Sequence, residues 1–222
     1  MTVLTVDVEP DFPPYLNTCM GLKGLKYLAG ILSKHGCGAT FFVTARFLDQ
    51  NPEMLEWLSG FEIGCHGLEH VRYDNLSRQE VCEHLDKAIE IFLEHDIPPR
   101  GFRAPYARAN KILLREVAAR FDYDSSRNVW NPGQSIMPDY PIYAGGKFFG
   151  VSPTIFNLVD AVPYKHKVYF IHSWEYGGVD FKKIIGRRQG MKAFGYCQRN
   201  YFTNLSKLLD SGTVGIADII DG

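Results

Sequence analysis

Two histidines four residues apart, His66 and His70, are the residues of this sequence best suited to bind a metal ion. Imidazoles at positions i and i+4 can reach one ion where the backbone turns helically, because those positions share a face. A further ligand is available where an early apolar run ends in the carboxylates Asp7, Glu9 and Asp11. Two histidines and one carboxylate leave coordination positions open, which is typical of catalytic rather than structural metal sites.

Short apolar runs alternate with stretches of helical spacing along the sequence. The runs predict buried strands, and apolar residues that recur every three to four positions predict helices between them. Ser77 and Glu80 form a capping-box pattern that marks the start of one helix. We expect strands at residues 3–8, 39–44, 61–65, 102–103, 123–125 and 168–172, and helices at residues 21–34, 52–59, 77–95, 111–120 and 201–209.

This alternation predicts an α/β fold, because strand–helix repeats build parallel sheets with right-handed crossovers. We expect a single domain over residues 1–222, folded as a distorted or incomplete (β/α) barrel of mostly parallel strands. Residues 128–152 interrupt the pattern and are rich in proline and glycine. They predict an inserted β-hairpin over one end of the barrel, with strands at residues 140–143 and 147–149 around Gly145 and Gly146.

Ionisable residues occur where the predicted strands end. Asp7 lies in the first strand, His66 follows the third, Arg103 lies in the fourth, and Asp124 and His172 lie in the fifth and the last. The carboxyl ends of parallel barrel strands converge on one mouth, where barrel enzymes have their active sites. Five strand ends that each bring an ionisable side chain to this mouth therefore predict a catalytic site.

The composition narrows the class of protein. A formal net charge of −1 over 222 residues gives no basic surplus for nucleic acid, so we expect no nucleic-acid partner. No run approaches the about 18 apolar residues of a membrane span. Five cysteines without a C-x-x-C pair are typical of reduced thiols. With no signal-peptide pattern at the start, these features predict a cytoplasmic protein.

Five short motifs follow one another in the order found in the polysaccharide deacetylases, the NodB-homology carbohydrate esterases of family 4, which the sequence resembles from residue 1 to about residue 175. The motifs are Thr5-Val6-Asp7-Val8-Glu9, Ala39-Thr40-Phe41-Phe42-Val43, His66-x-x-x-His70, Arg103-Ala104-Pro105-Tyr106 and Phe170-Ile171-His172. The family usually has adjacent aspartates in the first motif. An Asp-Val-Glu spacing and the run His172-Ser173-Trp174-Glu175 are similar to a subgroup associated with lipid-linked or exported polysaccharides.

The resemblance implies a metal-dependent amidohydrolase that removes the acetyl group from an N-acetylated sugar. It implies that Glu9, His66 and His70 are the metal ligands, with Asp11 as the rival to Glu9 because Pro10 could turn the chain back. The cofactor expected is one divalent metal ion. Zinc is the first choice, and cobalt, nickel and manganese are the alternatives.

The other motif residues would carry out the proton transfers. The resemblance makes Asp7 the catalytic base, Arg103 its partner, His172 the general acid, and the backbone N–H of Tyr106 an oxyanion donor. A fourth family motif, an aspartate followed closely by a tryptophan, has a loose match in Asp124 and Trp130. The expected substrate-binding residues are Phe170, Trp174 and Trp130, of which Trp174 could equally belong to the core.

The expected partner is an N-acetylated sugar or glycan, with a lipid-linked or precursor form favoured. Contact with a membrane surface is left open, because Lys and Arg residues cluster within residues 182–192. Three other functions compete: hydrolysis of a cyclic amide or imide on the same fold, non-catalytic glycan binding, and zinc-peptidase activity. The last is suggested by Glu69, which completes an H-x-x-E-H pattern with His66 and His70.

Overall fold

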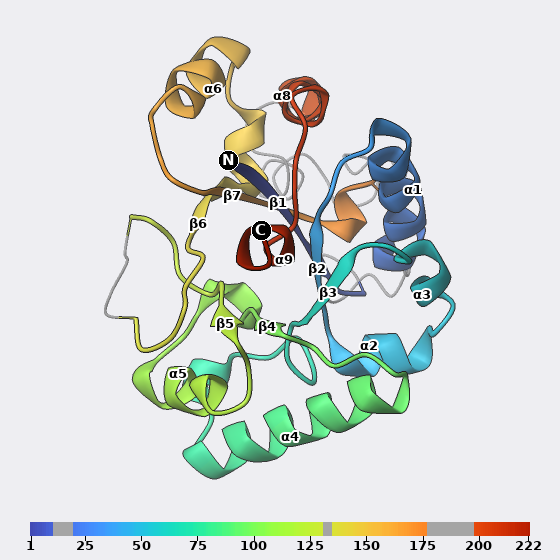
Figure 1. The fold of residues 1–222 in the computed structure, drawn as a ribbon, viewed down its shortest axis with the longest axis vertical. Helices are drawn as coiled ribbons and strands as arrows, with labels where there is room; N and C mark the ends of the chain where they lie inside the picture. The colour runs from blue at the N-terminus through green and yellow to red at the C-terminus, as the bar shows by residue number, and fades with distance from the viewer. Residues whose placement is uncertain (11–19, 131–134, 177–197) are drawn as a thin grey trace.

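The structure, a computed structural model, describes residues 1–10, 20–130, 135–176 and 198–222 (Figure 1). Within these ranges one sheet has the strand order β5-β4-β3-β2-β1-β7-β6, and every neighbouring pair is parallel. The strands are β1 (Thr2–Val8), β2 (Thr40–Val43), β3 (Glu62–Cys65), β4 (Gly101–Phe102), β5 (Tyr123–Asp124), β6 (Ile142–Gly145) and β7 (Lys167–His172).

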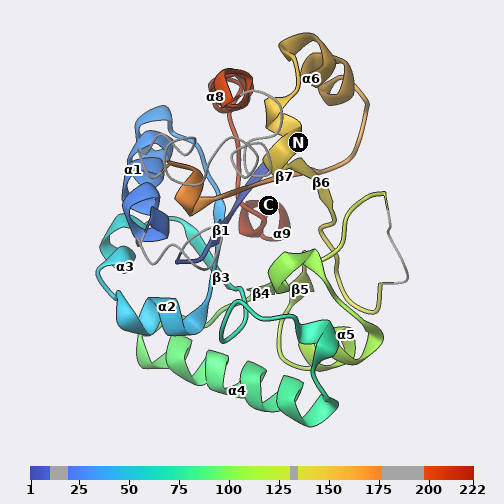
Figure 2. The same ribbon diagram turned by 180° about the vertical axis from the view of Figure 1, so that it is seen from behind.

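Helices surround the curled sheet on its outer side, except for the last one, which lies inside the ring of strands (Figures 1 and 2). They are α1 (Met20–His35), α2 (Ala45–Gln50), α3 (Met54–Trp57), α4 (Arg78–Glu94), α5 (Lys111–Ala118), α6 (Pro153–Asp160), α8 (Gln198–Asp210) and α9 (Ala217–Ile220). The short 3₁₀ helices in the described part of the chain are η1 (Tyr73–Asn75), η2 (Pro105–Ala107), η3 (Gly146–Gly150) and η4 (Ser173–Tyr176). The predicted capping box is present, because Ser77 and Glu80 bond each other's backbone N–H groups at the start of α4.

The sheet is an incomplete α/β barrel, as the strand–helix alternation predicts. Its two outermost strands, β5 and β6, do not form a continuous ladder with each other. Only isolated parallel bridges, Asp124 with Asp139 and Asn128 with Ile142, join the two edges within the described residues. The interior strand β1 is buried from Val3 to Val8, as expected for a parallel strand covered on both faces.

The predicted β-hairpin at residues 128–152 is wrong. Its first half is β6, which pairs in parallel with β7 instead of turning back. Its second half is the 3₁₀ helix η3, which α6 follows. Gly145 and Gly146 suggested a hairpin turn, but Gly145 lies beside Phe170 of β7, where a Cβ atom would be 2.2 Å from the Phe170 carbonyl oxygen. Close strand packing, rather than a turn, accounts for the glycine there.

The C-terminal segment closes the barrel end opposite the mouth. Ile216 N–H donates to Thr40 Oγ1 and Ala217 N–H donates to Glu62 Oε2, at the first residues of β2 and β3. Helix α9 therefore lies over the amino ends of the strands, in the middle of the ring of strands in Figure 1. The carboxyl ends remain for the site. No helix in the described ranges is both long and apolar enough to cross a membrane.

Candidate active site

A cavity of about 370 Å³ lies at the carboxyl ends of β1, β6 and β7. The predicted site residues that line it include Asp7, Glu9, His70 and His172. The strand register explains why they meet. Asp7 of β1 is the register partner of His172 of β7, and partners on parallel strands point to the same side of the sheet. The sheet thus delivers two titratable groups to one face of the cavity.

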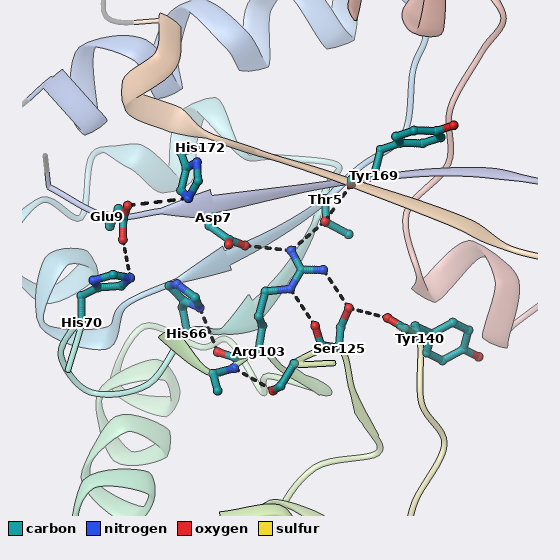
Figure 3. A network of polar contacts seen from close by, with 12 residues as sticks. Thr5, Asp7, Glu9, His66, His70, Arg103, Ser125, Tyr140, Tyr169 and His172 are labelled. Carbon is teal, nitrogen blue, oxygen red and sulfur yellow. Dashed lines mark hydrogen bonds and ion pairs between the residues drawn. The ribbon is translucent and has the colours of Figure 1, made fainter. Parts of the chain in front are cut away.

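Glu9, His66 and His70 come together as a group that could hold a metal ion. One ligand atom from each lies within 4.8 Å of the other two. Figure 3 shows His70 and Glu9 facing each other, with His66 beside them. The buried Oε2 atom of Glu9 lies 2.6 Å from Nε2 of His70, with which it forms an ion pair. A buried carboxylate oxygen close to two imidazole nitrogens fits a divalent cation.

The electrostatics of Glu9 agree with a cation site. Burial disfavours its charged form, but contact with His70 and the charges of His172 and His66 outweigh burial and lower the pKa of Glu9 to about 2. The carboxylate is therefore ionised at neutral pH. Trp174 holds its other oxygen, because the indole Nε1–H donates to Glu9 Oε1 over 2.8 Å. This bond turns Oε2 towards the histidines.

His66 is oriented by the backbone of the neighbouring strand end. Its Nδ1 lies 2.8 Å from the carbonyl oxygen of Arg103, which can only accept, so Nδ1 carries the proton and Nε2 keeps its lone pair. Burial lowers the pKa of His66 to about 4, although Asp7 and Glu9 oppose this shift. The imidazole is thus neutral at physiological pH, which is the form that binds a metal ion.

The segment between the two histidines is a bend and not a helix. Gly67 has φ +83°, and a Cβ atom there would lie 2.6 Å from the hydroxyl oxygen of Tyr73. Glu69 points away from the site and pairs with Arg46 at 2.5 Å, with about half of each side chain exposed. The helical turn expected between the histidines is therefore absent. The H-x-x-E-H peptidase interpretation is wrong, because it needs a helix with the glutamate beside the metal.

Asp7 and Arg103 form the second part of the site. Arg103 Nη1 donates to Asp7 Oδ1 over 2.8 Å, and the guanidinium is completely buried (Figure 3). The rest of the guanidinium is held by Thr5 Oγ1 and by the hydroxyl and carbonyl oxygens of Ser125. Burial would raise the pKa of Asp7, but Arg103 and the nearby His66 and His172 lower it. Asp7 is therefore an ionised carboxylate with a fixed orientation.

His172 and Glu175 form the third part. His172 Nδ1 lies 2.9 Å from Glu175 Oε1, and the hydroxyl of Tyr201 on α8 donates to Glu175 Oε2. Burial would lower the pKa of His172, but the bond to Glu175 and the charges of Glu175, Glu9 and Asp7 raise it to about 9. His172 thus carries a proton at neutral pH. Its Nε2 lies on the side of the ring towards Glu9, 4.0 Å from Oε1.

The predicted substrate-binding residues have different environments. Phe170 and Trp174 line the cavity. Trp174 is only 2% exposed, stacks on His172 with ring centroids 4.7 Å apart, and donates to Glu9, so it supports the site from within the core. Trp130 is 77% exposed and does not line the cavity. The structure therefore does not bring Trp130 to the site. Asp11 lies outside the described residues.

Tyr106 also lines the cavity and belongs to η2, which follows β4. Its φ is 61° and that of the next residue, Ala107, is 50°, a left-handed conformation rare for residues with a Cβ atom. The Tyr106 ring packs on His70 with centroids 4.4 Å apart. Two consecutive residues in this region indicate backbone strain, which often occurs at functional sites.

Asp124, the loose match to a fourth motif, does not reach the cavity. It accepts hydrogen bonds from the backbone N–H and hydroxyl of Ser126, whose hydroxyl oxygen accepts from Ala104 N–H over 2.8 Å. Burial raises the pKa of Asp124 to about 6. This chain of bonds holds the backbone that leads into Pro105 and Tyr106. Asp124 therefore positions the cavity wall.

The sequence interpretation assigned no site role to four residues that hold the titratable groups in place, namely Thr5, Ser125, Glu175 and Tyr201. Glu175 occurs in the run that is similar to a subgroup of the family, and Thr5 begins the first motif, but neither pattern indicates which side chain each residue contacts. Tyr201 and Ser125 occur in a predicted helix and a predicted strand, and the partner of a buried hydroxyl group is fixed only by the fold.

The chain belongs to the polysaccharide deacetylase family, whose family model matches residues 2–125. A curated relative, the peptidoglycan-N-acetylglucosamine deacetylase PgdA of Listeria monocytogenes, is 32% identical over 89 residues, which are 39% of this chain and 19% of that protein. The chain spans between 19% and 36% of the length of the curated relatives that it matches.

Solved structures share the fold. A crystal structure from Mycobacterium smegmatis assigned to the polysaccharide deacetylases superposes with a TM-score of 0.73 at 18% identity, covering 99% of this chain and 88% of that one. A CE4 family pseudoenzyme from Bacillus anthracis has a TM-score of 0.62 at 17% identity, covering 98% of this chain and 64% of that one. At these identities the likeness shows the fold alone.

Proposed function

We propose that this protein is a metal-dependent amidohydrolase that removes the acetyl group from an N-acetylated sugar. The observation that carries the proposal is the convergence of three groups in one cavity. They are the buried carboxylate of Glu9 beside two histidines, the Asp7 carboxylate held by Arg103, and the protonated His172. A cation site, a base and an acid together are what hydrolysis of an unactivated amide requires.

Glu9, His66 and His70 would hold one divalent metal ion, because their ligand atoms converge and His66 presents the lone pair of Nε2. When bound, the ion acts as a Lewis acid that polarises the amide carbonyl and lowers the pKa of a water molecule towards ~7. Nitrogen and oxygen ligands in this combination favour zinc, with cobalt, nickel and manganese as alternatives. We place Glu9, rather than Asp11, as the third ligand.

Asp7 acts as the general base that takes a proton from the attacking water. The Arg103 bond keeps the carboxylate ionised and aims it, and it leaves Asp7 Oδ2 for the transferred proton. The buried Arg103 side chain touches Asp7 from below the cavity, so it positions the base without contacting substrate. The backbone N–H of Tyr106 is our candidate donor to the developing oxyanion, because Tyr106 lines the same cavity as the base and the acid.

His172 acts as the general acid. An amine leaves poorly until it is protonated, so the chemistry needs a proton donor separate from the base. Glu175 keeps His172 protonated at neutral pH while Asp7, its register partner on β1, is ionised. The two roles follow from environments that push the pKa values of the pair in opposite directions. The His172 proton at Nε2 is the one available for transfer, since Nδ1 faces Glu175.

The substrate class follows from the family and from the relative in Listeria monocytogenes, whose name specifies peptidoglycan N-acetylglucosamine. We propose an N-acetylated sugar of a precursor or lipid-linked glycan, acted on in the cytoplasm. Contact with a membrane surface through the basic cluster at residues 182–192 is part of this prediction, and those residues lie outside the described ranges.

Two other functions are less well supported. A non-catalytic glycan-binding protein, or a pseudoenzyme such as the structural neighbour from Bacillus anthracis, has no need of a base, an acid and a cation site together. A cyclic amide or imide hydrolase could use the same residues. It would release no acetate, so the products separate the two activities.

The test is acetate release from a panel of N-acetylated sugars, nucleotide sugars and lipid-linked sugars, with dihydropyrimidine and hydantoin substrates as the cyclic controls. We expect acetate in stoichiometric amounts with free amine from at least one N-acetylated sugar. Ring opening of a cyclic substrate, with no acetate released from any sugar, would show that the protein is a cyclic amide or imide hydrolase instead. No turnover of either group by metal-loaded protein would favour the non-catalytic function.

A further inference from the structure

The cavity wall beyond the titratable cluster is mostly apolar. It is made by Ile142, Gly145, Gly146 and Phe170 from the β6–β7 edge, and by the single charged residue Lys147. None of these side chains is an amide, hydroxyl or carboxylate that could bond to sugar hydroxyls. The wall that faces the acid and base thus offers apolar surface and one ammonium group.

The chain geometry directs Lys147 to the mouth. Strand β6 pairs with β7 up to Gly145, the register partner of Phe170, two residues before His172. Gly146 then has φ +51°, a left-handed conformation that ends the strand and begins η3. A Cβ atom on Gly146 would contact only the end of the Phe170 ring, at 3.6 Å, so the space above it is open. Lys147 follows directly and lines the cavity.

The charge of Lys147 is not balanced within the described part of the chain. Its ammonium makes no ion pair or hydrogen bond there, whereas Asp7 is paired with Arg103 and His172 with Glu175. Glu9 carries one negative charge, which a divalent ion held with the two histidines would more than balance. Lys147 is therefore an exposed cation at a mouth where every carboxylate has a positively charged partner. A cleft with surplus positive charge favours an anionic ligand.

We propose that Lys147 binds an anionic group of the substrate, a phosphate or a carboxylate carried by the same sugar unit as the N-acetyl group. This rests on the proposed function and narrows its substrate class to acidic N-acetylated sugars. The apolar wall of Ile142 and Phe170 would cover the sugar ring, and the Lys147 ammonium would favour acidic sugars over neutral ones. The alternative is a lysine that merely projects into solvent from the rim.

Binding measured without metal tests the proposal independently of turnover. Protein treated with chelator is titrated with N-acetylglucosamine, N-acetylglucosamine 1-phosphate and N-acetylmuramic acid, so that no anion can bind to a metal ion. We expect both acidic sugars to bind about tenfold more tightly than the neutral one, with the preference reduced at high salt. Comparison of the affinities for N-acetylglucosamine 1-phosphate and N-acetylmuramic acid shows whether a phosphate or a carboxylate is preferred.

Substitutions of Lys147 test whether this residue binds the anionic group. Lys147→Met should abolish the preference and leave the neutral sugar unchanged, and Lys147→Arg should retain most of it. Lys34→Met is the matched control, because Lys34 is an exposed lysine in the last turn of α1. Equal affinities for neutral and acidic sugars in the wild type, or a preference that survives Lys147→Met, would overturn the proposal. If the preference depends on Lys147 but no sugar releases acetate, the proposed deacetylation fails and the anion site remains.

Discussion

Asp7 and His172 are register partners on the neighbouring parallel strands β1 and β7, yet their surroundings drive their protonation in opposite directions. Arg103 lowers the pKa of Asp7 against the effect of burial, whereas Glu175 raises the pKa of His172 to about 9 against the same effect. At neutral pH one partner is an anion and the other a cation. This division makes specific predictions about rate, metal content and pH.

Asp7→Asn should keep the fold and the metal ion but lower turnover by about 10²–10⁴-fold, because it removes the proton acceptor and none of the three proposed ligands. Metal content by elemental analysis and the rate of acetate release are measured on the same preparation. Loss of the metal from Asp7→Asn would show that Asp7 is a ligand and that the base lies elsewhere. Arg103→Lys is the companion variant, and it should lose turnover while retaining the metal.

His66→Ala and His70→Ala should each lose both the metal ion and turnover, because each removes one of three convergent ligand atoms. Glu9→Gln should lose the metal as well, and Asp11→Asn should retain it. Glu69→Gln is the matched control, since Glu69 pairs with Arg46 outside the site. Retained metal in Glu9→Gln together with loss in Asp11→Asn would reverse our choice of third ligand.

His172→Ala should slow amide hydrolysis far more than hydrolysis of an activated aryl ester. A phenolate leaves without protonation, but an amine does not, so only the amide needs the acid. The two rate constants are compared for wild type and variant at one pH. Equal losses of rate on the amide and the ester would mean that His172 binds the substrate or supports the structure of the site, and does not donate a proton.

The pH dependence should show its alkaline limb near the pKa of His172. The group acts while protonated, so activity is present below about pH 9 and falls as pH rises through that value. Asp7, with a lowered pKa, stays ionised through the neutral range and limits the rate only at acid pH. Glu175→Gln removes the largest contribution that raises the His172 pKa, and the alkaline limb should move down by about one pH unit or more. If the alkaline limb of Glu175→Gln is unchanged, that limb does not report the protonation of His172.

Much of the fold could be predicted because local patterns and tertiary packing agree. The buried run of β1, the periodicity of α1 and the capping box at Ser77 each specify one element, and the structure has all three. Residues 140–149 could not be predicted, because the Gly145-Gly146 pair is compatible with a hairpin turn as well as with close packing against β7. Long-range pairing decided between these two conformations.

The candidate site was predictable to the extent that its residues stand at strand ends. Parallel strands bring such residues together, and Asp7, Glu9, His66, His70, Arg103 and His172 were identified on that basis. The sequence could not specify the bonds that set their protonation, such as the Arg103 contact with Ser125 across 22 residues. Trp130, an aromatic residue near a motif, is 77% exposed and does not line the cavity, so its contact with substrate stays a prediction.

The most direct test of metal-dependent deacetylation is a titration of exhaustively stripped protein with zinc, followed by the rate of acetate release from the best N-acetylated sugar. We predict no release without metal, and a rate that rises linearly with zinc and stops rising at about one ion per chain, as expected for one group of three ligands. Acetate release at the full rate from the stripped protein, or a rate that zinc, cobalt, nickel and manganese all fail to restore, would contradict the account.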